Sequence, residues 1–66
     1  MTIVINGSPR EVPDDLTIEA FLLDAAGTTR GSAVVVDGEV VPRSEWPSRP
    51  LRDGQAVELI TAVQGG

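Results

Sequence analysis

The chain has 66 residues, with ten acidic and five basic side chains and a formal net charge of −5. A chain this short holds one domain with one small core. Histidine, cysteine, lysine and tyrosine are all absent, which removes a side chain that titrates near neutrality, a thiol nucleophile, a Schiff-base amine and a phenol. These absences argue against an enzyme, and the missing cysteine excludes disulfides and Cys-ligated metals.

The charge distribution bears on the possible partners. All five basic residues are arginines and they form no basic stripe, which argues against nucleic acid as a partner. An acidic balance keeps a small protein soluble, and it also favours a basic partner surface. The opening residues 1–5 contain neither a basic segment nor a long apolar run. We therefore expect no signal peptide, no membrane span and a cytoplasmic location.

The first predicted element is a hairpin. Residues 2–5 are β-branched and apolar, Asn6-Gly7 supplies the two residues that most readily adopt positive φ, and residues 8–12 return. Pro9 cannot donate to a ladder, so the second strand is expected at a sheet edge or to be short. In the first strand, Ile3 and Ile5 are expected on the buried face.

A helix follows. Thr17 fits an N-cap, and Glu19 places a negative charge in the first turn, where it suits the macrodipole. The apolar residues at positions i, i+3, i+4 and i+7 form one stripe that is expected to lie on the sheet: Ile18, Phe21, Leu22 and Ala25. Gly27 is well placed to end the helix in a left-handed conformation.

A second hairpin is predicted by Asp37-Gly38, which lies between the strand-like segments 33–36 and 39–41. Residues 43–46 lie between two prolines and predict a short helical turn. The only tryptophan, Trp46, is expected to cover one end of the core with its indole N–H near the surface.

The last predicted strand covers residues 56–63, after a turn at Asp53-Gly54, and Leu51 is expected to enter the core just before it. Alternation directs one set of side chains inward: Val57, Leu59 and Thr61. The other set faces outward: Glu58, Ile60 and Ala62.

The element order predicts an α+β fold in which one helix lies across a mixed sheet of four or five strands. If the first strand is near the centre and receives the last strand alongside it, Val4 and Ile60 share one open face. Together with Ala62, these residues form a candidate docking face beside the chain end. The other interpretation is an ordinary surface with some exposed apolar atoms.

The final strand runs directly into Gly65-Gly66. Because glycine has no Cβ, these residues can lie extended in a channel too narrow for any side chain. Residues 63–66 are therefore predicted to form a flexible extended tail, about 13 Å long at ~3.3 Å per residue. The competing interpretation is that small residues simply collect at frayed chain ends.

This element order with a terminal Gly-Gly resembles the β-grasp fold of ubiquitin-like proteins. Within it, residues 1–66, as a single domain, are similar to the bacterial sulfur carriers of the ThiS family. The segments that carry the resemblance are Ile3–Gly7, Leu16–Glu19, Phe21–Leu23, Val40–Trp46, Asp53-Gly54, Val57–Leu59 and Gly65-Gly66. The Val40–Trp46 segment is the most specific of them.

The resemblance implies a carrier protein with no catalysis and no bound cofactor of its own. A ThiF-type adenylyltransferase uses MgATP to adenylate the Gly66 carboxylate. A cysteine desulfurase or sulfurtransferase supplies sulfur, and the resulting thiocarboxylate donates it in the thiazole synthase ThiG of thiamin biosynthesis. In such a carrier, Gly65 passes through the partner's channel while Val63 and Gln64 contact its mouth.

Other functions also fit a Gly-Gly terminus. The chain could carry sulfur for another pathway, as the MoaD-like carriers of molybdopterin synthesis do, or it could be a protein modifier joined through Gly66 to lysines of targets. A third possibility is a passive β-grasp interaction module. Because the chain has no lysine, it offers no ε-amine for conjugation to itself.

Overall fold

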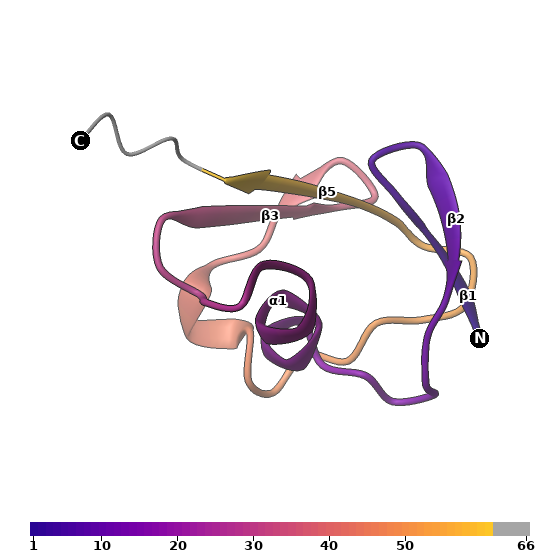
Figure 1. Ribbon diagram of the computed structural model, residues 1–66, viewed down its shortest axis with the longest axis horizontal. Coiled ribbons are helices and arrows are strands. Elements are labelled where there is room, and N and C mark those ends of the chain that lie inside the picture. The colour runs from indigo at the N-terminus through magenta and orange to yellow at the C-terminus, as the bar shows by residue number, and fades with distance from the viewer. Residues whose placement is uncertain (62–66) are drawn as a thin grey trace.

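The computed structural model describes residues 1–61 and shows a mixed five-stranded sheet with one α-helix across one face (Figure 1). The elements in chain order are β1 (Thr2–Ile5), β2 (Ser8–Glu11), α1 (Ile18–Ala26), β3 (Ser32–Val36), β4 (Glu39–Val40), the 3-10 turn η1 (Arg43–Glu45) and β5 (Ala56–Thr61). The α+β prediction is confirmed, and the strand order is β2-β1-β5-β3-β4.

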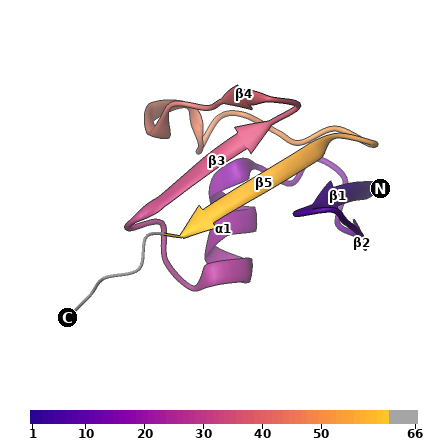
Figure 2. The same ribbon diagram turned by 90° about the horizontal axis from the view of Figure 1, so that it is seen from above.

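Strand β5 occupies the centre of the sheet. It runs parallel to β1, with Val4 opposite Ala56, and antiparallel to β3, with Ser32 opposite Thr61. Figure 2 shows β3 and β5 side by side across α1. The first and last strands are therefore neighbours, as the sequence indicated, and the chain leaves the described structure from the end of the central strand.

Both hairpins form at the predicted turns. In the first, Asn6 and Gly7 have φ values of 48° and 85°, and in the second, Asp37 and Gly38 have 49° and 84°. Two consecutive positive φ angles are the signature of the type I′ turn, whose twist matches that of the flanking strands. Strand β2 lies at the sheet edge, where Pro9 costs no ladder hydrogen bond.

Helix α1 begins and ends at the predicted caps. The Thr17 hydroxyl accepts a hydrogen bond from the Ala20 N–H at 3.1 Å. Gly27, with φ 74°, donates its N–H to the Leu23 carbonyl at 3.0 Å. The predicted stripe is correct for Ile18, Phe21 and Leu22, which are buried against the sheet.

The prediction for the fourth residue of the stripe was wrong, because Ala25 is exposed. It lies in the last turn of a nine-residue helix, beyond the residues that α1 packs on the sheet. Its single methyl group does not join the buried core cluster, and the neighbouring Ala26 is partly buried instead.

The core lies between α1 and the sheet. Its buried side chains are Ile3, Ile18, Phe21, Leu22, Val34, Val36, Val41, Trp46, Leu51 and Val57. Ile5 and Leu59 are partly buried and pack against this cluster. The inward orientation of Ile3, Ile5, Val57 and Leu59 and the burial of Leu51 therefore follow the sequence predictions.

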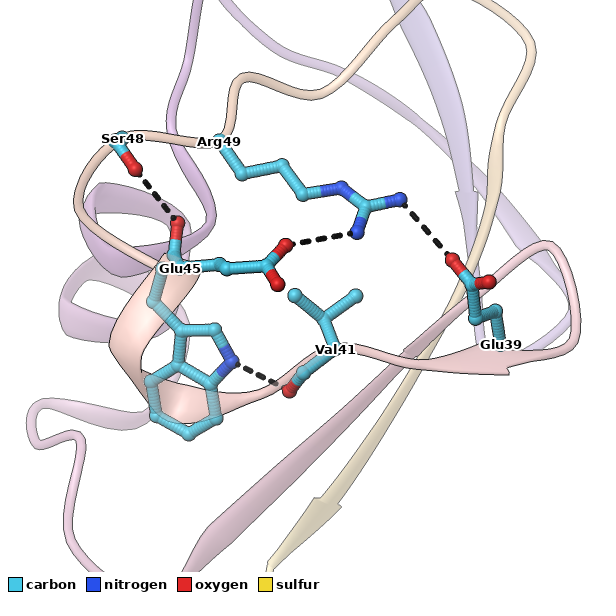
Figure 3. Close-up of polar contacts among 6 residues, drawn as sticks. Glu39, Val41, Glu45, Ser48 and Arg49 are labelled. Atoms are coloured by element: carbon cyan, nitrogen blue, oxygen red, sulfur yellow. Dashed lines mark hydrogen bonds and ion pairs between the residues drawn. The ribbon is translucent and has the colours of Figure 1, made fainter.

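Trp46 closes one end of the core, but its polar atom is not where we expected it. The indole is 3% exposed, and its N–H is buried and donates to the Val41 carbonyl at 3.0 Å (Figure 3). The η1 turn folds the indole back over the preceding residues, and a buried N–H requires such an acceptor. The prediction of an N–H near the surface was therefore wrong.

Arginine side chains hold the segment around Trp46 from outside. The Arg49 guanidinium forms ion pairs with Glu45 at 3.3 Å and Glu39 at 3.4 Å, which link the η1 turn to β4 (Figure 3). The Arg43 guanidinium lies 5.4 Å from the centroid of the Trp46 ring. These contacts are structural, and they position the segment that follows β4.

The substitution Trp46→Phe should destabilise the fold. It keeps an aromatic ring but leaves the Val41 carbonyl without its indole partner, and a buried polar group that loses its partner costs about 1–3 kcal/mol. Urea unfolding should show a lower midpoint. The control is Leu23→Ala, because Leu23 is 50% exposed and surface changes stay within about 0.5 kcal/mol. A wild-type midpoint for Trp46→Phe would contradict the role of this hydrogen bond.

Candidate functional site on the open face of the sheet

The face of the sheet turned away from α1 is the candidate site. Figure 1 shows α1 on one side of β3 and β5. Residues opposite each other in register point to the same side of a sheet. The residues of the opposite side, hereafter the open face, are Thr2, Val4, Pro9, Glu11, Ala33, Val35, Val40, Ala56, Glu58 and Ile60.

The open face is mainly apolar and accessible. Ile60 is 53% exposed and Val40 is 68% exposed, whereas Val4 and Val35 are partly buried. Val4 lies opposite Ala56, and Ile60 lies four positions further along β5. At about 3.3 Å per residue, the two side chains are roughly 13 Å apart on the same face.

Glu58 lies between these apolar positions. Its side chain is exposed, and none of the ion pairs within residues 1–61 includes it. The open face thus combines apolar side chains at both ends of β5 with one negative charge in the middle. Such a surface complements an apolar patch that carries a basic residue.

The tail itself lies outside the described residues. The sequence predictions for Ala62, Val63, Gln64, Gly65 and Gly66 therefore stay predictions. The last described residue, Thr61, lies in β5 opposite Ser32. In the sequence, residues 62–66 therefore follow directly on a strand that contributes to the open face.

The part of the chain that the structure describes contains no candidate metal centre. Among residues 1–61, no group of three or more His, Cys, Asp or Glu side chains could hold a metal ion. A surface hollow is lined in part by Asp14 and Asp53. Both carboxylates are already used, since Asp14 pairs with the Met1 ammonium at 3.2 Å and Asp53 accepts the Thr2 N–H at 2.9 Å.

Within residues 1–61, no helix is long and apolar enough to cross a bilayer.

One contact near the site has no signal in the sequence. The Asn6 side chain, which the sequence indicated only as a turn residue, forms two hydrogen bonds with the backbone of Leu59. The two residues are 53 positions apart. Local sequence patterns cannot predict such a pair, because the two residues meet only when β1 and β5 lie side by side.

The arrangement defines the class of protein. A sheet whose central last strand runs parallel to the first, with one helix across it and a Gly-Gly ending in the sequence, is a ubiquitin-like β-grasp domain. Among solved structures, the crystal structure of the thiamine biosynthesis protein ThiS from Geobacter metallireducens matches with a TM-score of 0.81 and 30% identity. That match covers 100% of both chains.

Sequence comparison identifies the family. The model of the ThiS family matches residues 3–66, so the chain belongs to the ThiS family. It is 37% identical to the sulfur carrier protein ThiS of Thermus thermophilus, over 94% of this chain and 95% of that one. A thiazole synthase of Paramagnetospirillum magneticum is 33% identical over 100% of this chain, which corresponds to 20% of that protein.

These findings confirm the resemblance inferred from the sequence. The chain is a small sulfur carrier of thiamin biosynthesis and not a catalyst. A carrier has different requirements from an enzyme. It must fold stably and fit its partners, and the described residues form a compact core beneath an accessible sheet face.

The substitution Ile60→Thr should leave stability almost unchanged, because Ile60 is on the open face and threonine keeps a β-branched side chain. We expect a change within about 0.5 kcal/mol by urea unfolding. The matched control is Leu59→Thr, which removes a side chain that packs against the core and should cost about 1–2 kcal/mol. Equal losses in the two variants would show that the faces are assigned wrongly.

Proposed function

We propose that the chain carries sulfur in the cytoplasm as a thiocarboxylate on Gly66 and delivers it to a ThiG-type thiazole synthase. The observation that carries this proposal is that the ThiS family match extends through Gly66, so it includes the Gly65-Gly66 ending. The structure supports it, because the central strand β5 leads directly toward this end.

The chemistry requires a partner enzyme. An ionised carboxylate is a poor electrophile, so a ThiF-type adenylyltransferase with MgATP first activates it. The Gly66 carboxylate attacks the α-phosphorus of ATP, an acyl-adenylate forms and pyrophosphate leaves. A desulfurase or sulfurtransferase holds sulfur from cysteine as a persulfide, whose terminal sulfur attacks the acyl carbon and displaces AMP. A second thiol then reduces the resulting acyl disulfide, which releases the thiocarboxylate and leaves a disulfide between the two thiols. The carrier contributes only the carboxylate and the shape of its tail.

The two glycines at the chain end are explained by the narrow channel of the partner enzyme that the tail has to enter. Gly65 and Gly66 lack Cβ atoms, so they fit a channel that would exclude larger residues. Val63 and Gln64 are then the residues at the mouth of that channel. The four residues 63–66 span about 13 Å when extended, which lets the folded domain stay outside the partner's active site.

The thiazole synthase of Paramagnetospirillum magneticum supports the identity of the sulfur acceptor. A segment similar to this entire chain forms about a fifth of that protein. A carrier-like segment joined to a thiazole synthase is expected when the two must meet, since linkage raises their effective concentration. This is the reason to choose thiazole formation over the other pathways that use related carriers.

The substitution Gly66→Ala should abolish thiocarboxylate formation while the fold is kept, because the added Cβ blocks the channel. The measurement is the intact mass of the chain after incubation with the adenylyltransferase, MgATP and a sulfur source. Wild type should show one exchange of oxygen for sulfur. Leu23→Ala is the control and should behave like wild type. A thiocarboxylate on the Gly66→Ala variant would contradict the mechanism, and adducts on other proteins would favour a protein modifier.

The same proposal assigns a role to the open face. Its apolar residues Val4 and Ile60 would dock on the activating enzyme, with Ala62 continuing the contact toward the channel. Because Glu58 lies between the apolar positions of β5 on this face, the complementary surface is apolar with a basic residue opposite Glu58. Docking here would hold the domain while the tail enters the active site.

The substitution Ile60→Asp should therefore raise the KM for adenylation about tenfold or more, since a charge buried in an apolar contact is costly. The control is Leu23→Asp, because Leu23 is 50% and Ile60 53% exposed but Leu23 lies on α1, across the sheet from the open face. Steady-state release of pyrophosphate provides the measurement. Equal KM values for the two variants would exclude the open face as the docking surface.

A further inference from the structure

Strand β5 is held by the first turn residue of each hairpin, once near each end. At its start, the Asp37 carboxylate accepts the Ala56 N–H at 2.9 Å, and the Asp37 N–H donates to the Ala56 carbonyl at 2.8 Å. Near its other end, the Asn6 Oδ1 accepts the Leu59 N–H at 3.0 Å, and the Asn6 Nδ2 donates to the Leu59 carbonyl at 3.4 Å. The two contacts are similar in kind but lie at different distances from the tail.

The Asn6 contact replaces a missing strand. Strand β1 ends at Ile5, and the Asn6 N–H still donates to the Val57 carbonyl at 2.9 Å. The chain then turns away into β2. After Val57, Leu59 is the next residue of β5 whose backbone N–H and carbonyl point toward this side and require hydrogen-bond partners. The carboxamide of Asn6 supplies both an acceptor and a donor, as a strand backbone would.

The two sides of β5 therefore differ. On the β3 side, the ladder continues to the pair Ser32 and Thr61. On the β1 side, the last contact within residues 1–61 is the one that Asn6 makes with Leu59. Leu59 is two residues before Thr61, so within residues 1–61 this contact is the hydrogen-bonded pair on that side nearest to the tail in sequence.

We propose that Asn6 is a positioning residue for the tail. Its side chain fixes Leu59 and so sets the direction in which the chain leaves the sheet, without any contact with the reacting carboxylate. The inference rests on the proposed function, since it concerns the delivery of Gly66 to the activating enzyme. A tail that starts in the correct direction reaches the reactive geometry more often, which is the usual benefit of preorganisation.

The chain offers a closely matched control for this role. Asn6 and Asp37 have φ angles of 48° and 49°, and each precedes a glycine in a hairpin turn. The variants Asn6→Gly and Asp37→Gly each remove one of the two side chains that hydrogen-bond to the backbone of β5. Glycine accepts positive φ without strain, so neither turn is disturbed. A purely structural role predicts similar consequences for the two variants, because both contacts are exposed hydrogen bonds to β5.

The experiment compares adenylation of the full chain by the ThiF-type enzyme, with pyrophosphate release as the readout. For Asn6→Gly we expect kcat to fall about three- to tenfold, the equivalent of one hydrogen bond, with KM unchanged because the open face is intact. Asp37→Gly should keep wild-type kcat. Asn6→Asp retains an acceptor for the Leu59 N–H and should recover most of the loss. Amide exchange should accelerate at Leu59 in Asn6→Gly.

Each outcome decides the question. Equal kcat values for Asn6→Gly and Asp37→Gly, with a wild-type chain that is adenylated normally, would overturn the positioning role and leave the proposed function intact. A wild-type chain that is not adenylated would defeat the proposed function and this inference with it. If Asn6→Gly does not fold, Asn6→Ser replaces it, since the shorter side chain does not reach Leu59, and the same fall in kcat is required.

Discussion

The pairing of β5 between β1 and β3 is the constraint on which the rest of the structure depends. It joins the two hairpins into one sheet, and its inward residue Val57 is 1% exposed beneath α1. Without this strand, neither hairpin has enough apolar surface to fold alone. The same strand leads toward the Gly-Gly ending. The strand that completes the core is therefore also the strand that precedes the Gly-Gly ending in the sequence.

Local signals explain why most of the fold could be predicted. Asn6-Gly7 and Asp37-Gly38 identify their turns because few residues accept positive φ, and Thr17 and Gly27 delimit the helix by cap chemistry. The errors concern tertiary contacts. Ala25 has helical spacing but nothing to pack against, and the acceptor for the Trp46 N–H depends on how η1 folds back.

The candidate site also combines features that local sequence signals predict with a tertiary contact that they do not. That Val4 and Ile60 share a face follows from strand alternation once the first and last strands are paired. The tail lies outside the described residues and stays a prediction from its glycines. The contact of Asn6 with Leu59 could not be predicted, because it joins a turn to a strand 53 residues away. The lack of His, Cys, Lys and Tyr, which first argued against an enzyme, agrees with a sulfur carrier of the ThiS family.

The central place of β5 also has a consequence for biosynthesis on the ribosome. Strand β1 emerges early, but its partner in the middle of the sheet follows about fifty residues later, and non-local pairings of this kind form late in folding. A nascent chain interrupted before β5 would hold two unconnected hairpins and an uncovered helix. Proteases would degrade such a fragment readily, so incomplete chains would not accumulate.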